Sequence, residues 1–288
     1  MSTTKVLVVA PSSGGFENWK WSVIGGLSAL WLFYFVTLAV VQVLLPWSPA
    51  PEFCQNVGLS YPCTRPDLIA FQLTATVMMY YMGLHGLYGW HWWRPRNQHL
   101  LSTPQARVLG KLSHAETLCA GILTYQTWDF MASCATPELQ NPVFLIHHVL
   151  AGLTAYLSLE FQMMHHYAIF FGGCSEISTM ALVWVDLDRF FPASGQNNAW
   201  ATFIFVNQVI FVLTFIAYRI IGWPINSVTL WKDVVNGVLP HPTLSQLRPG
   251  KVWFLYVFLF MSVALGALQI YWFATGLVPK LVEFATAS

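Results

Sequence analysis

Residues 199–222 read AWATFIFVNQVIFVLTFIAYRIIG, a stretch of 24 residues with one charged side chain, Arg219. As an α-helix this stretch would be about 36 Å long, at about 1.5 Å per residue. The hydrocarbon core of a bilayer is roughly 30 Å thick, so one such helix can cross it. Six further segments have a similar apolar character, and they lie at about 22–46, 68–93, 112–134, 143–164, 166–185 and 252–276. The sequence therefore predicts a polytopic membrane protein with about seven transmembrane helices.

The composition of the whole chain supports this fold class. Apolar residues make up 56% of the 288 residues and charged residues only 9%, whereas about a quarter of a typical soluble domain is charged. The apolar segments lack the period-two alternation of an outer-membrane barrel, and a helix satisfies its own backbone groups in lipid. We therefore expect an all-α protein. The net charge of +1 and the absence of a basic stripe argue against a nucleic-acid partner.

The segments are not equally clear. Polar residues interrupt the third one, 112–134, which is the weakest prediction. The fourth and fifth meet around 163–167 with almost no linker, so they form either a tight helical hairpin or one long bent helix. The stretch 226–251 contains three prolines and is predicted to be a surface loop. The short apolar run at 6–10 is too short for a secretory signal, so no cleaved signal is expected.

The distribution of basic residues predicts the orientation. With the N-terminus in the cytosol, ten of the 13 basic residues face the cytosol. They are Lys5, Lys20, Arg94, Arg96, Arg107, Lys111, Arg219, Lys232, Arg248 and Lys251, against Arg65, Arg189 and Lys280 on the other side. The positive-inside rule therefore favours a cytosolic N-terminus and a C-terminus on the opposite side.

The five cysteines do not form a metal motif. No CxxC pair is present, and no cysteine has a ligand-like spacing to histidine, so a zinc or iron–sulfur site has little support. Cys54 and Cys63 share the first loop, on the side predicted to be oxidising, where a disulfide between them is plausible. We expect Cys119, Cys134 and Cys174 to be small packing residues of the helices.

Ionisable residues within the apolar segments are the main clue to function. Such residues are costly in lipid and normally face the bundle interior beside a partner. The candidates are His85, His114, Glu116, Asp129, His147, His148, Glu160, His165, His166 and Glu176.

The strongest group combines the third and fourth segments. His147 and His148 lie about one turn inside the fourth segment, and Asp129 lies near the end of the third. Because the connection is short, antiparallel packing can bring the carboxylate to the imidazoles. A carboxylate fixes the tautomer of a histidine and raises its basicity, as a general base requires. The alternative is that these side chains only hold the two helices together.

Glu176 is the second feature, in the middle of the fifth segment. A lone carboxyl group there would be protonated unless a histidine or water contacts it, and the neighbouring Gly172 and Gly173 permit the close approach of another helix. His165 is about 16 Å from Glu176 along a helix and cannot touch it. We expect His165 and His166 to mark the interfacial turn.

Other enzyme classes fit less well. The sequence has no GxSxG, HExxH, Walker or GxGxxG pattern, which argues against serine hydrolases, zincins and nucleotide-binding proteins. Membrane desaturases bind two irons through several histidine boxes, whereas this sequence has only two pairs of adjacent histidines.

The order of these motifs resembles the TLC domain, a six-helix module shared by ceramide synthases, translocation-associated membrane proteins and lipid-homeostasis proteins. The resemblance rests on residues 125–129 (YQTWD), 144–150 (FLIHHVL) and 176–179 (EIST), with Arg189 and Phe190 following. It implies a TLC domain at 65–280, an additional transmembrane helix at 22–46, and tails at 1–21 and 281–288. The ceramide synthase histidine pair corresponds to His147 and His148. Glu176 takes roughly the place of the first downstream acid and the second is absent, so the EIST run looks closer to the lipid-homeostasis branch.

Three functions follow from this resemblance. The first is a multi-pass protein, expected in the endoplasmic reticulum, that binds or processes a lipid or fatty acyl chain in an intramembrane cavity. Its polar head would contact His147, His148, Asp129 and Glu176. The second is an acyltransferase that joins a fatty acyl group to a sphingoid amine, with these four residues catalytic, acyl-CoA as co-substrate and no bound cofactor. The third is a non-enzymatic membrane chaperone or trafficking protein.

Overall fold

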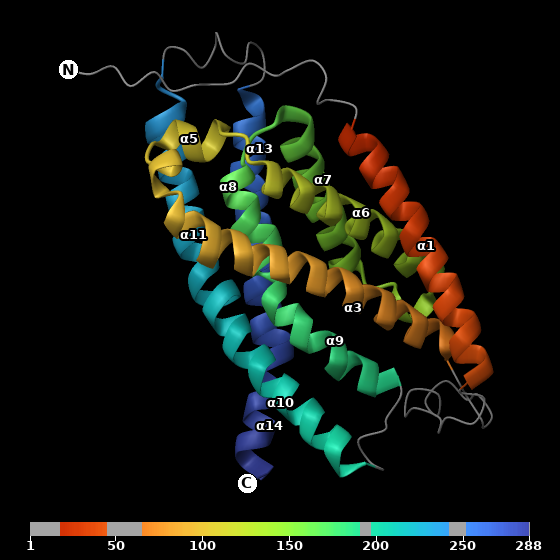
Figure 1. Ribbon diagram of the computed structural model, residues 1–288. Helices are drawn as coiled ribbons and strands as arrows, with labels where there is room; N and C mark the ends of the chain where they lie inside the picture. The colour runs from red at the N-terminus through yellow and green to blue at the C-terminus, as the bar shows by residue number, and fades with distance from the viewer. Residues whose placement is uncertain (1–17, 45–64, 191–196, 242–251, 288) are drawn as a thin grey trace.

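The structure, a computed structural model, describes residues 18–44, 65–190, 197–241 and 252–287 (Figure 1). All regular structure in these ranges is helical, which confirms the predicted all-α class. The helices join end to end into seven rods. These are α1 (Asn18–Leu44), α3 (Pro66–Leu87) with α4 (Arg94–Arg96), α6 (Ser113–Ala135), α7 (Pro142–Phe161), α8 (His165–Ala168) with α9 (Glu176–Phe190), α10 (Asn198–Thr214) with α11 (Trp223–Lys232), and α13 (Trp253–Trp272) with α14 (Val278–Ala287).

Five of these rods are long and apolar enough to cross a membrane. They are Asn18–Leu44, Pro142–Phe161, His165–Phe190, Asn198–Val238 and Trp253–Val282. The α3–α4 rod and α6 also correspond to predicted spans, but neither meets the same length and hydropathy criteria within the described residues. The sequence had already marked α6 as the weakest segment, because Glu116, Gln126 and Asp129 reduce its hydropathy. The chain is a polytopic membrane protein.

The α10–α11 rod is longer than predicted. It continues through a π-helical turn, Asp233–Val238, so the prediction that 226–251 is a loop is wrong for its first half. The reason is that Asp233 is buried with a partner: the short helix α5 (Pro104–Leu109) supplies Arg107, whose Nη2 donates to Asp233 Oδ1 at 2.6 Å. The hydroxyl of Tyr167 donates to the same carboxylate. The last rod is also longer than predicted, because α14 (Val278–Ala287) extends into the predicted C-terminal tail at 281–288.

The junction between the fourth and fifth segments is a sharp turn and not a bent helix. Gln162 and Met164 both have left-handed backbone conformations, with φ of 52° and 64°. His165 holds this turn in place: its Nδ1 accepts the Leu112 N–H at 3.0 Å, and its Nε2 lies 3.3 Å from the Ser158 carbonyl oxygen. The expectation that this histidine marks a turn is therefore confirmed, although its side chain is fully buried.

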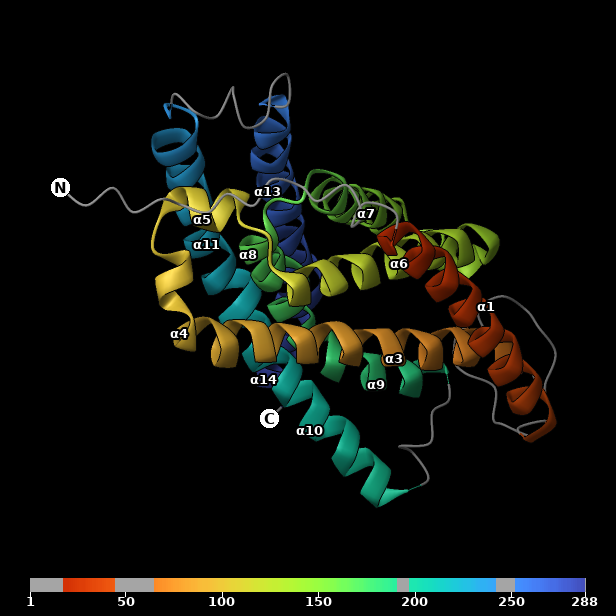
Figure 2. The same cartoon turned by 45° about the horizontal axis from the view of Figure 1, so that its top comes forward.

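Two close contacts define the middle of the bundle. Helices α6 and α7 pack side by side, and α3 crosses the α8–α9 rod (Figures 1 and 2). At this crossing a Cβ added to Gly86 would lie 2.2 Å from the carbonyl carbon of Gly173, so the two backbones touch. The contact immediately precedes Glu176 and fixes α3 against the start of α9.

The ends of the rods agree with the predicted alternation of the chain. Figure 1 shows the start of α1, α5 and the start of α13 at one end, and the ends of α1, α9 and α14 at the other.

At the start of α3, Arg65 pairs with Asp67 and with Glu138 in the α6–α7 connection. The hydrogen bond from the Arg65 guanidinium holds the pKa of Glu138 below that of an ordinary glutamate. This ion pair ties α3 to the end of α6.

Two of the three described cysteines are packing residues. Cys119 and Cys174 are free and buried, as expected, whereas Cys134 is free and exposed. The predicted Cys54–Cys63 disulfide lies outside the described residues.

Candidate functional site

Asp129 and His148 meet between α6 and α7, as the sequence predicted. His148 Nε2 lies 3.5 Å from Asp129 Oδ1, and Ser133 Oγ donates to the same oxygen at 2.9 Å. The other ring nitrogen, His148 Nδ1, is 2.6 Å from Gln126 Oε1. Both residues are buried. The short α6–α7 connection sets this register, because the two helices must run antiparallel.

Both nitrogens of His148 are engaged in this arrangement. If the Gln126 amide is oriented as described, Nδ1–H donates to its oxygen, and Nε2 carries a hydrogen toward Asp129 only in the imidazolium form. If the amide is turned, Gln126 donates to Nδ1 and the neutral ring donates Nε2–H to Asp129. In neither case does His148 have a free nitrogen for a ligand. Its role in this geometry is to hold Asp129 and Gln126.

His147 differs from its neighbour. Its Nδ1 is shielded from solvent and has no hydrogen-bond partner in the described structure. Its ring lies edge-on to Trp272, with 5.1 Å between the ring centroids. An unpaired buried imidazole nitrogen is costly, so it marks a place where a ligand group or water would be bound.

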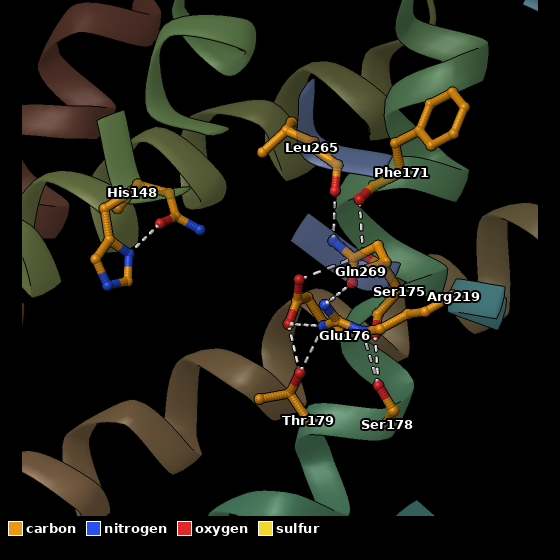
Figure 3. Close-up of polar contacts among 10 residues, drawn as sticks. His148, Phe171, Ser175, Glu176, Ser178, Thr179, Arg219, Leu265 and Gln269 are labelled. Atoms are coloured by element: carbon orange, nitrogen blue, oxygen red, sulfur yellow. Dashed lines mark hydrogen bonds and ion pairs between the residues drawn. The ribbon is translucent and has the colours of Figure 1, made fainter. Parts of the chain in front are cut away.

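Glu176 is paired with Arg219, not with a histidine. Arg219 Nη2 lies 3.1 Å from Glu176 Oε2, and both side chains are buried. The remaining contacts of Arg219 come from the same region (Figure 3). Nε donates to the Ser175 carbonyl and to Ser178 Oγ, both at 3.0 Å, Nη1 donates to Gln269 Oε1 at 2.8 Å, and Nη2 also donates to Thr179 Oγ1 at 2.8 Å.

A pocket joins His147 to this pair. Its lining includes Gln126, His147, Glu176, Arg219 and Gln269. Every rod except α1 contributes at least one lining residue. We call this space the polar pocket.

A second pocket adjoins the polar pocket. The two share Phe171, Trp223 and Leu265. Apart from the hydroxyl groups of Thr154, Ser158 and Ser262 and the Tyr167 ring, its lining is apolar or aromatic, and it extends along α7 and α13. We call it the apolar pocket. Polar groups at one end of a largely apolar space are typical of sites that bind small amphipathic molecules.

The six rods that enclose the polar pocket coincide with a known sequence family. A family model for the TLC domain matches residues 67–276, which leaves out α1 and includes the parts of all six rods that line the pocket. This chain belongs to the TLC-domain family. A search of the curated proteins and of the solved structures finds no match.

Within the TLC domain, the four predicted site residues fall into two groups. His147 and Glu176 both line the polar pocket. His148 and Asp129 contact each other behind it and do not line it. The structure therefore brings two of the four predicted residues to the polar pocket, and the functional roles of all four stay predictions.

The sequence interpretation missed three pocket residues of the TLC domain. Arg219 was counted among the cytosolic basic residues, which is wrong, because only 7% of its surface is exposed and it lies in the middle of the rod Asn198–Val238. The apolar sequence on both sides of Arg219 was the signal that could have predicted its burial within the span. Gln126 was noted only as an interruption, and Gln269 was not singled out. Amides in apolar helices that face the bundle interior indicate polar contacts across it.

The other ionisable candidates are not in the polar pocket. His85 Nδ1 is 2.8 Å from the Tyr81 carbonyl oxygen one turn earlier. Glu116 contacts Lys111 and Gln162 near the sharp turn. His166 stacks on Trp90, with 5.4 Å between ring centroids. Among the residues of the described ranges, no three His, Cys, Asp or Glu side chains are placed to hold a metal ion.

Proposed function

We propose that this TLC-domain protein binds a lipid or fatty acyl chain within the membrane, with the polar head in the polar pocket and the hydrocarbon chain in the apolar pocket. The observation that carries the proposal is the unpartnered His147 Nδ1 in the same pocket as the Glu176–Arg219 pair, a pocket that shares Phe171, Trp223 and Leu265 with the apolar pocket. Because the chain would pass from the apolar bilayer into an apolar pocket, the hydrophobic effect adds little, and the contacts of the head decide which lipid binds. Lipid homeostasis in the endoplasmic reticulum is the role and place that we propose for it.

Each polar residue has a distinct part in this proposal. His147 contacts the head directly. Asp129 and Gln126 fix the ring of His148, whose position on α7 adjoins that of His147. Glu176 and Arg219 form the opposite wall and keep α9 and α10–α11 together.

Mass spectrometry of the purified protein with its copurified lipids tests this proposal. We expect His147→Ala to fold and to lose or exchange the bound lipid species. The matched control is His166→Ala, because His166 Nδ1 is also buried without a partner but lies outside both pockets. Identical lipid content in wild type and His147→Ala would contradict the proposal. If His147→Ala only lowers the unfolding temperature, the chaperone or trafficking function is favoured.

The same free nitrogen supports a second function, an acyltransferase. In that reaction an amine or hydroxyl of the acceptor would attack the thioester of acyl-CoA while His147 takes its proton. His147 would then give that proton to the departing sulfur, so that CoA leaves as the thiol. Purified protein incubated with labelled acyl-CoA and a sphingoid base would form a labelled amide. Absence of both product and acyl-enzyme would exclude this second function and would leave lipid binding intact.

A further inference from the structure

The polar pocket is balanced in charge. Of the side chains that line it, only Glu176 and Arg219 are a carboxylate and a guanidinium, and they neutralise each other at 3.1 Å. The one nearby carboxylate outside the lining, Asp129, faces His148. The pocket therefore offers no unpaired charge to a ligand.

Most of the hydrogen-bonding positions of the two charged groups are already occupied. Arg219 donates to five oxygen atoms from α8–α9 and α13. Glu176 Oε2 accepts from Thr179 Oγ1 at 2.7 Å in addition to Arg219, whereas Oε1 lies 3.3 Å from Ser175 Oγ, whose hydrogen is donated to the Phe171 carbonyl at 2.6 Å. A ligand that took either partner would have to break several bonds that already exist.

Besides Glu176 Oε1, two uncharged groups are left to contact a ligand. His147 Nδ1 has no partner. Gln126 uses the Oε1 end of its amide on His148, and the other end makes no hydrogen bond within the described residues. Gln269, by contrast, is fully used, since Nε2 donates to the Leu265 carbonyl and Oε1 accepts from Arg219.

From this inventory we infer that the polar pocket selects lipids whose head is uncharged and can both donate and accept a hydrogen bond, such as a hydroxyl or an amide. This inference rests on the proposed lipid-binding function. A carboxylate or an ammonium group would be buried without a counter-charge, and such burial is unfavourable. A hydroxyl or amide meets the imidazole nitrogen and the Gln126 amide at no such cost.

The structure also offers a way to reverse the selectivity. Glu176→Gln removes the carboxylate and keeps a side chain of the same shape. Arg219 is still held by Ser175, Ser178 and Gln269, but its charge is no longer neutralised. The variant pocket then carries one free positive charge and accepts a fatty carboxylate.

The test compares three ligands of one chain length in lipid nanodiscs: a fatty alcohol, the corresponding fatty acid at a pH where it is ionised, and the corresponding fatty amine where it is protonated. Retention on the protein is measured by native mass spectrometry. For wild type we expect at least a tenfold preference for the alcohol, which corresponds to about 1.4 kcal/mol. Equal or tighter binding of either charged ligand would overturn the inference.

The Glu176→Gln variant sharpens the test. We expect it to retain the carboxylate at least tenfold better than wild type does. Glu160→Gln is the matched control, because Glu160 is a partly exposed carboxyl group in α7 that does not line the pocket, and its preference stays that of wild type. If Glu176→Gln does not fold, the wild-type comparison decides alone. If no ligand of any class binds to wild type, the proposed function itself fails, whereas preferred binding of a charged ligand refutes only the neutral-head inference.

Discussion

The chain contains two pairs of adjacent histidines, and the structure uses them differently. In the pair at α8, His165 has both ring nitrogens on backbone groups, the Leu112 N–H and the Ser158 carbonyl. In the pair at α7, His148 has both nitrogens on side chains, those of Gln126 and Asp129, and His147 faces the polar pocket. A histidine that satisfies backbone groups at a chain reversal stabilises the fold, whereas one fixed by other side chains beside a pocket can serve a ligand.

The largest expected effect separates the two pairs by stability. His165→Ala removes the only acceptor of the Leu112 N–H and leaves a void in a fully buried position. We expect a loss of about 3 kcal/mol in the free energy of unfolding, measured by denaturation in detergent, with unchanged lipid species in the folded fraction. His99→Ala, at an exposed position, is the control. A His165→Ala protein as stable as wild type would show that the histidine pair at α8 does not differ from the pair at α7 by stabilising the fold.

A double-mutant cycle between His148 and Asp129 addresses the other pair. Each single alanine substitution leaves a buried partner behind, so we expect losses of about 2 kcal/mol each and a coupling of about 1–2 kcal/mol. The cycle is measured by thermal unfolding. Additive losses, with no coupling, would show that the 3.5 Å contact does not contribute to stability.

Matched phenylalanine substitutions compare the two remaining histidines. His147 and His166 each bury an unpartnered Nδ1 beside a tryptophan, and phenylalanine keeps the ring while it removes that nitrogen. We expect both variants to stay within about 1 kcal/mol of wild type in stability. Only His147→Phe is expected to change the lipid content, as measured by mass spectrometry. A change with His166→Phe of the same size would mean that the effect is not specific to the polar pocket.

The smallest expected effect is the pH dependence of the Arg65–Glu138 ion pair, which joins the start of α3 to the α6–α7 connection. The pKa of Glu138 is lowered by Arg65 from the ordinary 4.5, so the ion pair stabilises the fold above that value and is lost as pH falls through the lowered pKa. Because both groups are partly exposed, the contribution is less than about 1 kcal/mol. Arg65→Gln is expected to flatten the stability profile in this acidic range. An unchanged profile would show that the pair does not contribute.

Sequence alone was sufficient for the helices and for one contact of the site. Spans such as 22–46 are visible because lipid demands a long uninterrupted apolar run. The Asp129–His148 contact follows from two helices and a connection too short for any packing except antiparallel. Both inferences depend on local rules.

Contacts between distant helices were not predictable in the same way. Arg219 lies inside the predicted span 199–222 but was counted on the cytosolic side, because charge counting places arginine outside the membrane, and only its contact with Glu176, 43 residues away, explains its burial. Similarly, the helix was expected to end before Asp233, since nothing in the local sequence shows that Arg107 neutralises that carboxylate. A buried charge can be understood only together with its partner.

The backbone contact between Gly86 and Gly173 has a consequence for how the protein can adapt to its occupants. No side chain separates α3 from the α8–α9 rod at this contact. A movement of α3 along the α8–α9 rod would therefore displace the main chain just before Glu176. The wall formed by α3 and α9 is therefore stiff. Accommodation of longer or bulkier hydrocarbon chains falls to α13, whose Phe258, Met261 and Leu265 side chains line the apolar pocket and can change rotamer.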